Sequence, residues 1–136
     1  MTSEATDVAR QGYAALAAGD MDAVLELVDP AIELEIYTGR PDLPETLRLH
    51  GHQGFVENLT MLDEVFDDME VEPVEYHEAG EHLVVTINTS GRGKGSGITV
   101  ENSVVHIWTI RDGKAIRFRV YATKREALDA IAREKR

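Results

Sequence analysis

Apolar residues recur at three- and four-residue steps in the first part of the chain, which is the period of an amphipathic helix. Gly19 ends the first predicted helix, whose buried face carries Ala5, Val8, Ala9, Gly12, Tyr13 and Leu16. Asp20 can cap a second, short helix that Pro30 closes. A third helix is expected from about Gln53 to Phe66, and its apolar stripe contains Phe55, Leu59, Leu62 and Phe66.

Elsewhere the apolar and polar positions alternate, which indicates half-buried β-strands. The first strand is expected at Ala31–Tyr37, and the segment Thr38–His52 after it reads as a long loop with two glycines and two prolines. Four further strands are expected at Val71–Tyr76, His82–Ser90, Ile98–Arg111 and Lys114–Tyr121. Pro73 within the first of these four indicates an edge strand or a bulge.

Short turns join the last four strands, so the pattern predicts an antiparallel meander. Asp112-Gly113 favours a type I′ hairpin. The glycine-rich segment 91–97 is interpreted as a flexible hairpin and not a phosphate loop, because a strand follows it where a phosphate loop needs a helix. Thr123 and Glu126 form a capping box for a last helix. The order of elements predicts one α+β domain over residues 1–136, with helices segregated to one side of a mostly antiparallel sheet.

Composition and charge exclude several classes of function. The 136 residues contain no cysteine, which excludes disulfides, thiolate metal sites and cysteine nucleophiles. A net charge of −11 argues against nucleic-acid partners. The polar N-terminus does not resemble a signal peptide, and no apolar run is long enough to cross a membrane, so a cytoplasmic protein without a membrane partner is expected.

The charges are unevenly distributed along the chain. Residues 57–81 contain ten acidic residues and no lysine or arginine, whereas residues 111–136 contain nine basic and four acidic residues. The simpler interpretation is a pair of solvated faces that attract each other within or between subunits. The alternative is a partner surface, and the acidic segment 63–81 is its candidate.

His106 is the main candidate for chemistry. It alternates with apolar residues on the strand face that carries Asn102, Val104, His106, Trp108 and Ile110, so it is expected to point inward. It is either a core histidine with a satisfied partner or a pocket residue. A metal site is not expected, because His50 and His52 bring no third ligand.

Several other residues are candidates for a pocket wall. Tyr13, Tyr37 and Trp108 each combine an apolar body with a polar group. The strand Lys114–Tyr121 alternates two sets, and ordinary reasoning buries Ile116, Phe118 and Val120 and leaves Arg117, Arg119 and Tyr121 outside. Which face of this strand, and of the strand Ile32–Tyr37, lines a pocket is left open.

The motifs together resemble SnoaL-like proteins, a branch of the NTF2-like superfamily, over nearly the whole chain. Residues 13–23, YAALAAGDMDA, resemble the opening block of that family, and Asp29-Pro30 before the first strand resembles the next block. Residues 51–55, GHQGF, are similar to the entry to the third helix. The C-terminal part of the resemblance comprises HIW at 106–108, RDGK at 111–114 and EAL at 126–128.

The resemblance implies a cone-shaped α+β fold, with a strongly curved sheet wrapped around N-terminal helices and a deep pocket for a small apolar ligand. It also implies no cofactor, no metal and a homodimer through the outer face of the sheet. The candidate residues for such a pocket are Tyr13, Leu34, Tyr37, Leu59, Trp108, Arg119 and Tyr121, with His106 as the candidate catalytic residue.

The resemblance transfers known activities only in part. His106 falls where ketosteroid isomerase has the acidic residue of its oxyanion hole, and the isomerase base falls near Leu34 or Glu35. Thr123 stands where relatives often carry aspartate, and the catalytic arginine and aspartates of epoxide hydrolases have no counterpart.

Two hypotheses about function follow. In the first, the protein is a cofactor-independent isomerase, cyclase or hydrolase acting on an apolar carbonyl or polycyclic substrate. His106 then acts as general base or oxyanion donor, oriented by Tyr13 or Tyr121. In the second, the same pocket belongs to a non-catalytic ligand-binding module or a dimeric interaction module.

Overall fold

The computed structural model describes residues 4–134, which form one curved sheet with four helices packed on it. The helices are α1 (Glu4–Ala17), α2 (Met21–Glu26), α3 (Gly51–Val65) and α4 (Lys124–Glu134). The strands are β1 (Val28–Tyr37), β2 (Thr46–His50), β3 (Phe66–Ala79), β4 (His82–Gly93), β5 (Thr99–Arg111) and β6 (Lys114–Tyr121). None of these helices is long and apolar enough to cross a membrane.

The six strands lie in the order β2-β1-β6-β5-β4-β3. The predicted meander of β3 to β6 is confirmed as three antiparallel pairs, and β1 joins it by pairing with β6 in parallel. The register of β3 on β4 shifts between Pro73 and Glu75, because proline has no N–H to give to the ladder. This irregularity belongs to the strand that forms one edge of the sheet.

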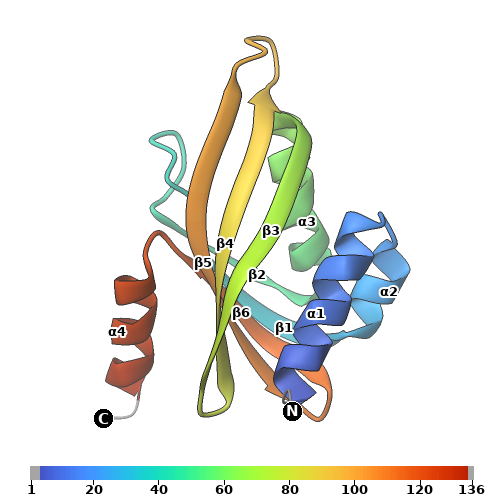
Figure 1. The fold of residues 1–136 in the computed structure, drawn as a ribbon, viewed down its shortest axis with the longest axis vertical. Helices are drawn as coiled ribbons and strands as arrows, with labels where there is room; N and C mark the ends of the chain where they lie inside the picture. Colours follow the sequence, from blue (N-terminus) through green and yellow to red (C-terminus); the bar gives the residue numbers. More distant parts are fainter. Residues whose placement is uncertain (1–3, 135–136) are drawn as a thin grey trace.

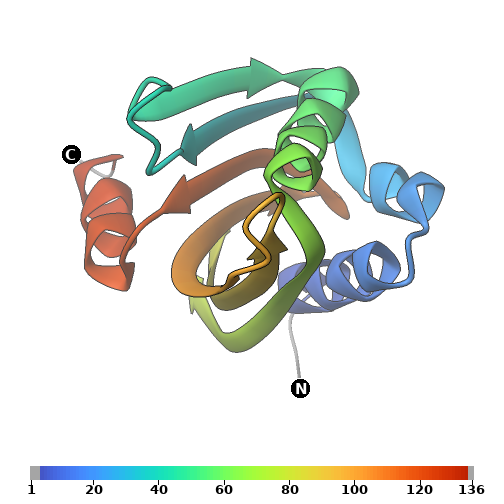
Figure 2. The same cartoon turned by 90° about the horizontal axis from the view of Figure 1, so that it is seen from above.

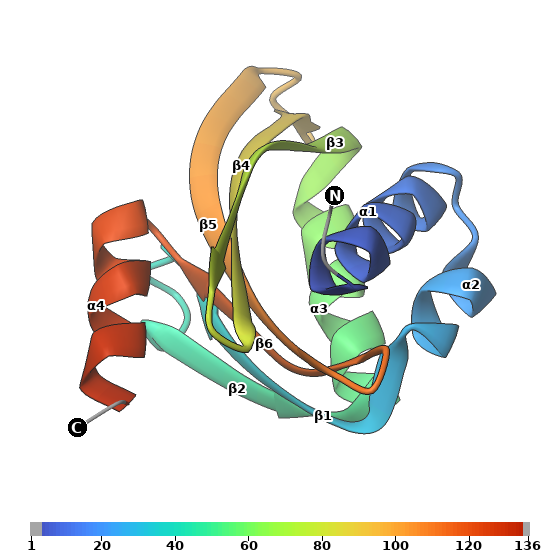
Figure 3. The same ribbon diagram turned by 60° about the horizontal axis from the view of Figure 1, so that its bottom comes forward.

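The sheet curves strongly and does not close (Figures 1 and 2). Helices α1, α2 and α3 lie on its concave side, whereas α4 lies on the convex side (Figure 3). The α+β class is confirmed, but the expectation that all helices share one side is wrong for α4. Its apolar face contains Ala127 and Ile131, and these pack against Val84, Val105 and Ile107, which point outward from β4 and β5.

Local signals in the sequence fix several boundaries as expected. Asp20 caps α2, since its Oδ1 accepts a hydrogen bond of 3.1 Å from the backbone N–H of Ala23. Thr123 caps α4 in the same way through the N–H of Glu126 at 3.2 Å. Asp112 and Gly113 both have positive φ, 53° and 78°, as a type I′ turn requires.

Two expected boundaries are wrong. The segment between β1 and α3 is not only a loop, because its last part forms the edge strand β2, antiparallel to β1. Leu47 and Leu49 are half-buried and alternate with exposed residues over those five positions. The strand β1 also begins at Val28 and therefore contains Pro30, which was expected to close the preceding helix.

The main core lies between α3 and the β1–β6 part of the sheet. It contains Ile32, Leu34, Phe55 and Phe118, each at most 6% exposed. A second cluster, built on Leu83, Val85 and Ile87, packs under α1. These two clusters fill much of the concave face, and the larger of the spaces left on it lies beside Trp108.

Candidate functional site

A cavity of about 450 Å³ lies between the concave face of the sheet, α3 and the C-terminal half of α1. Most of its wall is apolar. The aromatic side chains that line it include Tyr13, Phe55, Trp108 and Phe118. Its size is within the usual range for small-molecule sites. A groove of about 590 Å³ along the outer side of α3 and β2 is larger but shallow, and Glu57 and Glu64 line it.

The lining of the cavity has almost no formal charge, although the whole chain carries −11. Among the described residues that line it there is no aspartate or glutamate. Arg40 alone brings a charge, and its guanidinium is bound to Asp42 at 2.6 Å in the exposed loop after β1. The remaining polar groups are neutral amides, hydroxyls, one imidazole and one indole, from Tyr13, Tyr37, Thr38, Asn58, Thr89, Ser90, Asn102, His106 and Trp108.

A chain of hydrogen bonds connects three aromatic side chains at the inner end of the cavity. The Trp108 Nε1–H donates to the Tyr13 hydroxyl oxygen at 2.7 Å, and the same hydroxyl lies 2.8 Å from Nδ1 of His106. The strand β5 supplies Trp108 and His106, two residues apart on one face, and α1 supplies Tyr13. Sequence separations of 93 and 95 residues mean that only the tertiary fold brings the three together.

The direction of this chain determines the tautomer of His106. The Tyr13 oxygen already accepts from Trp108, so its own proton is directed to His106 Nδ1. If Nδ1 carried the proton instead, the Tyr13 O–H would have no acceptor within residues 4–134, and an unpaired buried donor is costly. The imidazole proton therefore lies on Nε2, which has no hydrogen-bond partner within the described part of the chain.

The electrostatic surroundings favour the neutral forms of both side chains. Burial lowers the pKa of His106 to about 3, so the imidazole is neutral at pH 7. Burial also raises the pKa of Tyr13 well above its ordinary value, and Tyr13 therefore remains a donor. The inner end of the cavity therefore carries neutral side chains, and Arg40 in the loop after β1 is the charged residue among the described lining.

Aromatic packing holds the imidazole in place. The ring of Phe118 meets His106 edge to face with centroids 4.8 Å apart, and Phe118 also packs on Trp108 at 4.2 Å. Tyr13 lies nearly parallel to His106, at 18° and 6.0 Å. These contacts restrict rotation of the imidazole ring and so preorganise its N–H group.

The structure brings together most of the expected pocket residues but not all of them. Tyr13, Tyr37, Leu59 and Trp108 line the cavity with His106, and Tyr37 is 36% exposed. Leu34, Arg119 and Tyr121 lie elsewhere. Leu34 is 1% exposed and packs in the core under α3.

Arg119 and Tyr121 lie on the convex side because of the alternation along β6. Phe118 and Val120 face the cavity, so the residues between and after them face outward. Tyr121 packs there beside α4. Arg117, Arg119 and Tyr121 therefore face away from the cavity, as the alternation along the strand predicted. Arg119 is nevertheless only 1% exposed, because α4 covers it.

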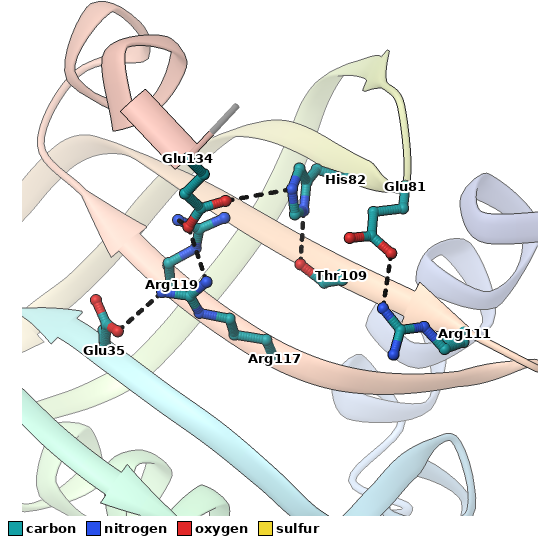
Figure 4. Close-up of polar contacts among 8 residues, drawn as sticks. All are labelled: Glu35, Glu81, His82, Thr109, Arg111, Arg117, Arg119 and Glu134. Carbon is teal, nitrogen blue, oxygen red and sulfur yellow. Dashed lines mark hydrogen bonds and ion pairs between the residues drawn. The ribbon is translucent and has the colours of Figure 1, made fainter. Parts of the chain in front are cut away.

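The outer face holds an ionic cluster (Figure 4). Oε1 of Glu134 accepts from Nη1 of Arg119 at 2.6 Å and from Nη1 of Arg117 at 2.8 Å. Arg117 also donates to Glu35 at 3.0 Å. Nε2 of His82 lies 3.4 Å from the other oxygen of Glu134, and its Nδ1 lies 2.7 Å from the Thr109 hydroxyl. Burial and the nearby Arg119 lower the pKa of His82.

Sequence reasoning missed several residues of the cavity wall. The loop residues Thr38 to Leu43 and the helix residue Asn58 carry no pattern that distinguishes a cavity wall from a solvated surface. Phe118 could have been assigned, because it pairs directly with Trp108 across β5 and β6. Within residues 4–134 no group of three or more potential ligands could hold a metal ion, and Nε2 of His52 instead contacts the Val28 carbonyl oxygen at 2.7 Å.

In a comparison with protein families, the model of the SnoaL-like domain matches residues 9–118, which include Tyr13, His106 and Trp108. A comparison with curated proteins of assigned function gives no match.

Solved structures share the fold. An NTF2-like protein of unknown function from Burkholderia pseudomallei K96243 is 22% identical, with a TM-score of 0.78 over 94% of this chain and 97% of that one. TerC, co-crystallised with polyporic acid, is 27% identical, with a TM-score of 0.75 over 93% and 97% of the two chains. A provisionally assigned SnoaL-like polyketide cyclase from Jannaschia sp. CCS1 is 19% identical, with a TM-score of 0.73 over 93% and 89%.

Proposed function

Because this chain belongs to the SnoaL-like domain family, we propose that its cavity binds a small, uncharged and largely apolar molecule that presents a hydrogen-bond acceptor to His106. The observation that carries the proposal is the series of hydrogen bonds from Trp108 through Tyr13 to His106. This series directs the Tyr13 proton to Nδ1 of His106, so the neutral imidazole carries its own proton on Nε2 and can donate it to a ligand. Carbonyl compounds and polycyclic aromatic molecules with ring oxygens fit this description.

The absence of charge in the described lining supports a neutral ligand. A buried ionic group needs a partner of opposite charge, and the lining offers no carboxylate and only one guanidinium, already paired with Asp42. The amides of Asn58 and Asn102 can bind further polar substituents of the ligand. The 27% identical TerC was co-crystallised with polyporic acid, and this supports a small-molecule ligand for the present cavity.

Catalysis is the second candidate, and the same preorganised N–H group favours it. A donor that is fixed before the reaction can stabilise negative charge that develops on a carbonyl oxygen during enolisation. A general-base role fits less well, because a pKa near 3 makes His106 a weak base. We therefore assign His106 the role of hydrogen-bond donor to the carbonyl oxygen, and the described lining of the cavity offers no carboxylate that could act as the base.

A matched pair of probes tests the binding proposal. 1-Tetralone and tetralin share one bicyclic skeleton, and only the former has a carbonyl oxygen. Trp108 is the single tryptophan of the chain and lines the cavity, so its fluorescence reports binding directly. We expect tetralone to bind about tenfold more tightly than tetralin, the value of one hydrogen bond of about 1.4 kcal/mol.

The control variant is His106→Phe, which keeps a ring in the site and removes the donor. We expect the preference for tetralone to disappear in this variant while tetralin binds as before. Equal affinities of the two probes in the unmodified protein would contradict the role of His106, and no binding of either probe would contradict the proposal itself. For the catalytic candidate, exchange of the tetralone α-protons for deuterium, followed by NMR, should be faster with the unmodified protein than with His106→Phe.

The expected homodimer through the outer sheet face and the expected cytoplasmic location are also part of this proposal. Helix α4 covers part of β4, β5 and β6 on the convex side, so a second copy would contact the strands that α4 leaves uncovered, β1 and β2 at one edge of the sheet or β3 at the other. Sedimentation over a range of concentrations tests the dimer.

A further inference from the structure

We infer that the convex face under the last turn of α4 is a carboxylate-binding site, which Glu134 of the same chain occupies in this structure (Figure 4). This site is separate from the cavity, because Arg117, Arg119 and His82 belong to the outer face of β6 and β4, whereas the cavity lies on the concave face. The inference does not depend on the proposed function.

Donors from three side chains converge on a single carboxylate. Arg119 and Arg117 bind the same oxygen of Glu134, at 2.6 and 2.8 Å. If Nδ1 of His82 accepts from the Thr109 hydroxyl, its Nε2–H is directed to the other oxygen of Glu134. The position of Glu134 therefore shows that a carboxylate fits between these groups.

The donors in this cluster outnumber the acceptors. Nε of Arg117 and both Nε and Nη2 of Arg119 are buried, and none of the three has a hydrogen-bond partner among the described residues. The Arg119 side chain is only 2% exposed. In a guanidinium, Nε and Nη2 form the edge that binds both oxygens of a carboxylate at once. Glu134 contacts Arg119 only through Nη1 and leaves that edge unused.

The other acidic side chain in the cluster cannot take the place of Glu134. Glu35 is the cross-strand neighbour of Arg119, but its side chain is bound to Arg117 at 3.0 Å and lies 3.4 Å from Arg48, and no hydrogen bond or ion pair joins it to Arg119. Among residues 4–134, the buried charge of Arg119 is therefore paired with Glu134 alone. A second carboxylate that entered from solution would bind a site already built for it.

Access requires only the end of α4 to move. Ala127, Ala130 and Ile131 anchor the middle of the helix and are buried, whereas the residues from 132 to 134 are exposed. The terminal turn of a helix opens at low cost in free energy. Glu134 thus acts as an internal competitor, and the ligand class that can replace it is a small monocarboxylate.

The test uses acetate as the probe and chloride at the same ionic strength as its control. In the variant Glu134→Ala the internal carboxylate is gone, so acetate at about 50 mM is expected to raise the melting temperature by about 3 °C more than chloride does. The double variant Glu134→Ala with Arg119→Met should lose this difference. Equal effects of acetate and chloride in Glu134→Ala, or a difference that persists without Arg119, would overturn the inference.

The unmodified protein is tested by NMR, which also covers the case in which the double variant does not fold. Acetate should move the amide signals of Arg133 and Glu134 toward unstructured positions, at concentrations about tenfold or more above those needed by Glu134→Ala, because Glu134 competes from within the chain. In Glu134→Ala the Arg119 Nε–H signal should shift with acetate and not with chloride. Fixed signals at 133 and 134 would show that the site is closed to external carboxylates and would refute the inference.

Discussion

At the scale of single residues, His106 is unusual because a potentially charged group is kept neutral by its surroundings. The imidazole receives a hydrogen bond from Tyr13 on Nδ1 and is enclosed by Phe118 and Trp108, so protonation would place a charge where no described carboxylate can balance it. The buried His106 therefore lowers the free energy of unfolding at acidic pH. Near neutral pH it stays a neutral hydrogen-bond donor, and its proton remains on the same nitrogen.

This cost gives a pH dependence with a defined sign. In the unfolded chain His106 binds a proton near pH 6.5, whereas in the folded chain its pKa is lowered to about 3. Between these values the unfolded state binds more protons, so the free energy of unfolding falls as pH decreases. The slope from this residue alone is about 1.4 kcal/mol per pH unit.

Urea denaturation between pH 7 and pH 5 measures that slope, since the carboxylates with lowered pKa, such as Glu75 and Glu81, lose their contribution only at lower pH. The variant His106→Gln cannot titrate and should show a shallower slope. His82, whose pKa is also lowered, contributes in the same direction and is retained in both proteins. An equal slope in the two proteins would mean that His106 is not held neutral.

Sequence reasoning reaches part of this residue-scale picture. The alternation along β5 is sufficient to place His106 and Trp108 on one face. It cannot identify Tyr13 as the shared partner, because that contact depends on how α1 crosses the sheet. It also leaves Arg119 outside, since nothing in the pattern of β6 indicates that a later helix covers it.

At the scale of elements, α3 packs unusually closely on the edge strand β2. A Cβ atom at Gly54 would lie 3.0 Å from Cβ of Leu49 and 3.3 Å from its carbonyl carbon. Neither atom is at the end of a flexible side chain, so the helix and the strand would have to separate. This contact positions one wall of the cavity, because α3 supplies Phe55, Asn58 and Leu59 to it.

Two glycine-to-alanine variants test this packing. Gly54→Ala gains about 1 kcal/mol of helix propensity but is expected to lose more through overpacking, for a net destabilisation of about 1 kcal/mol. Gly12→Ala in α1 is the matched control, since its nearest neighbour, Cδ1 of Leu27, would be 3.9 Å away and a small cavity of about 50 Å³ lies beside it.

We expect Gly12→Ala to stabilise the protein by about 0.5–1 kcal/mol. Chemical denaturation of the two variants side by side measures both values. Stabilisation by Gly54→Ala would show that α3 and β2 are not in close contact.

Elements with a strong period or a defined cap are predicted well from the sequence, and a short element among glycines and prolines is not. The capped helices α2 and α4 and the Asp112-Gly113 hairpin are all confirmed. The strand β2 has only two apolar residues, Leu47 and Leu49, and follows a loop with two prolines, so its alternation is too short to be recognised. It forms because β1 presents an unpaired edge to it.

At the scale of the whole molecule, the net charge of −11 works against folding. The acidic stretch from residue 57 to residue 81 is only partly balanced by the basic C-terminal part. Among the described residues two ion pairs join these regions, between Lys124 and Glu75 at 2.5 Å and between Arg111 and Glu81 at 2.9 Å. Both lie on exposed side chains, where an ion pair contributes little.

Added salt should therefore stabilise the protein. Between about 10 mM and 100 mM sodium chloride the screening length falls from about 30 Å to about 10 Å, which weakens repulsion across the molecule more than contacts at 3 Å. We expect the melting temperature to rise by a few degrees over this range, as measured by calorimetry. A fall in melting temperature would mean that the surface ion pairs outweigh the repulsion.

The overall fold was the most accessible property from the sequence. The meander and the N-terminal helices follow from the order of periodic segments, and the SnoaL-like motifs extend that conclusion to a curved sheet with an internal space. The boundaries of that space were not accessible, because they depend on how far each strand bends and on the loop from Thr38 to Leu43.

Most of the acidic stretch forms the edge strand β3, where its charges can also affect association between molecules. This strand has 14 residues and lies at the border of the sheet, so its outer side is a template onto which a strand of another molecule could add. Six of its residues are aspartate or glutamate, and Pro73 interrupts its ladder. We therefore expect the same repulsion that weakens the folded state to oppose edge-to-edge pairing of β3 strands from neighbouring molecules. At a pH low enough to protonate these carboxylates, the repulsion between β3 strands is lost, and storage at such a pH is expected to favour their pairing.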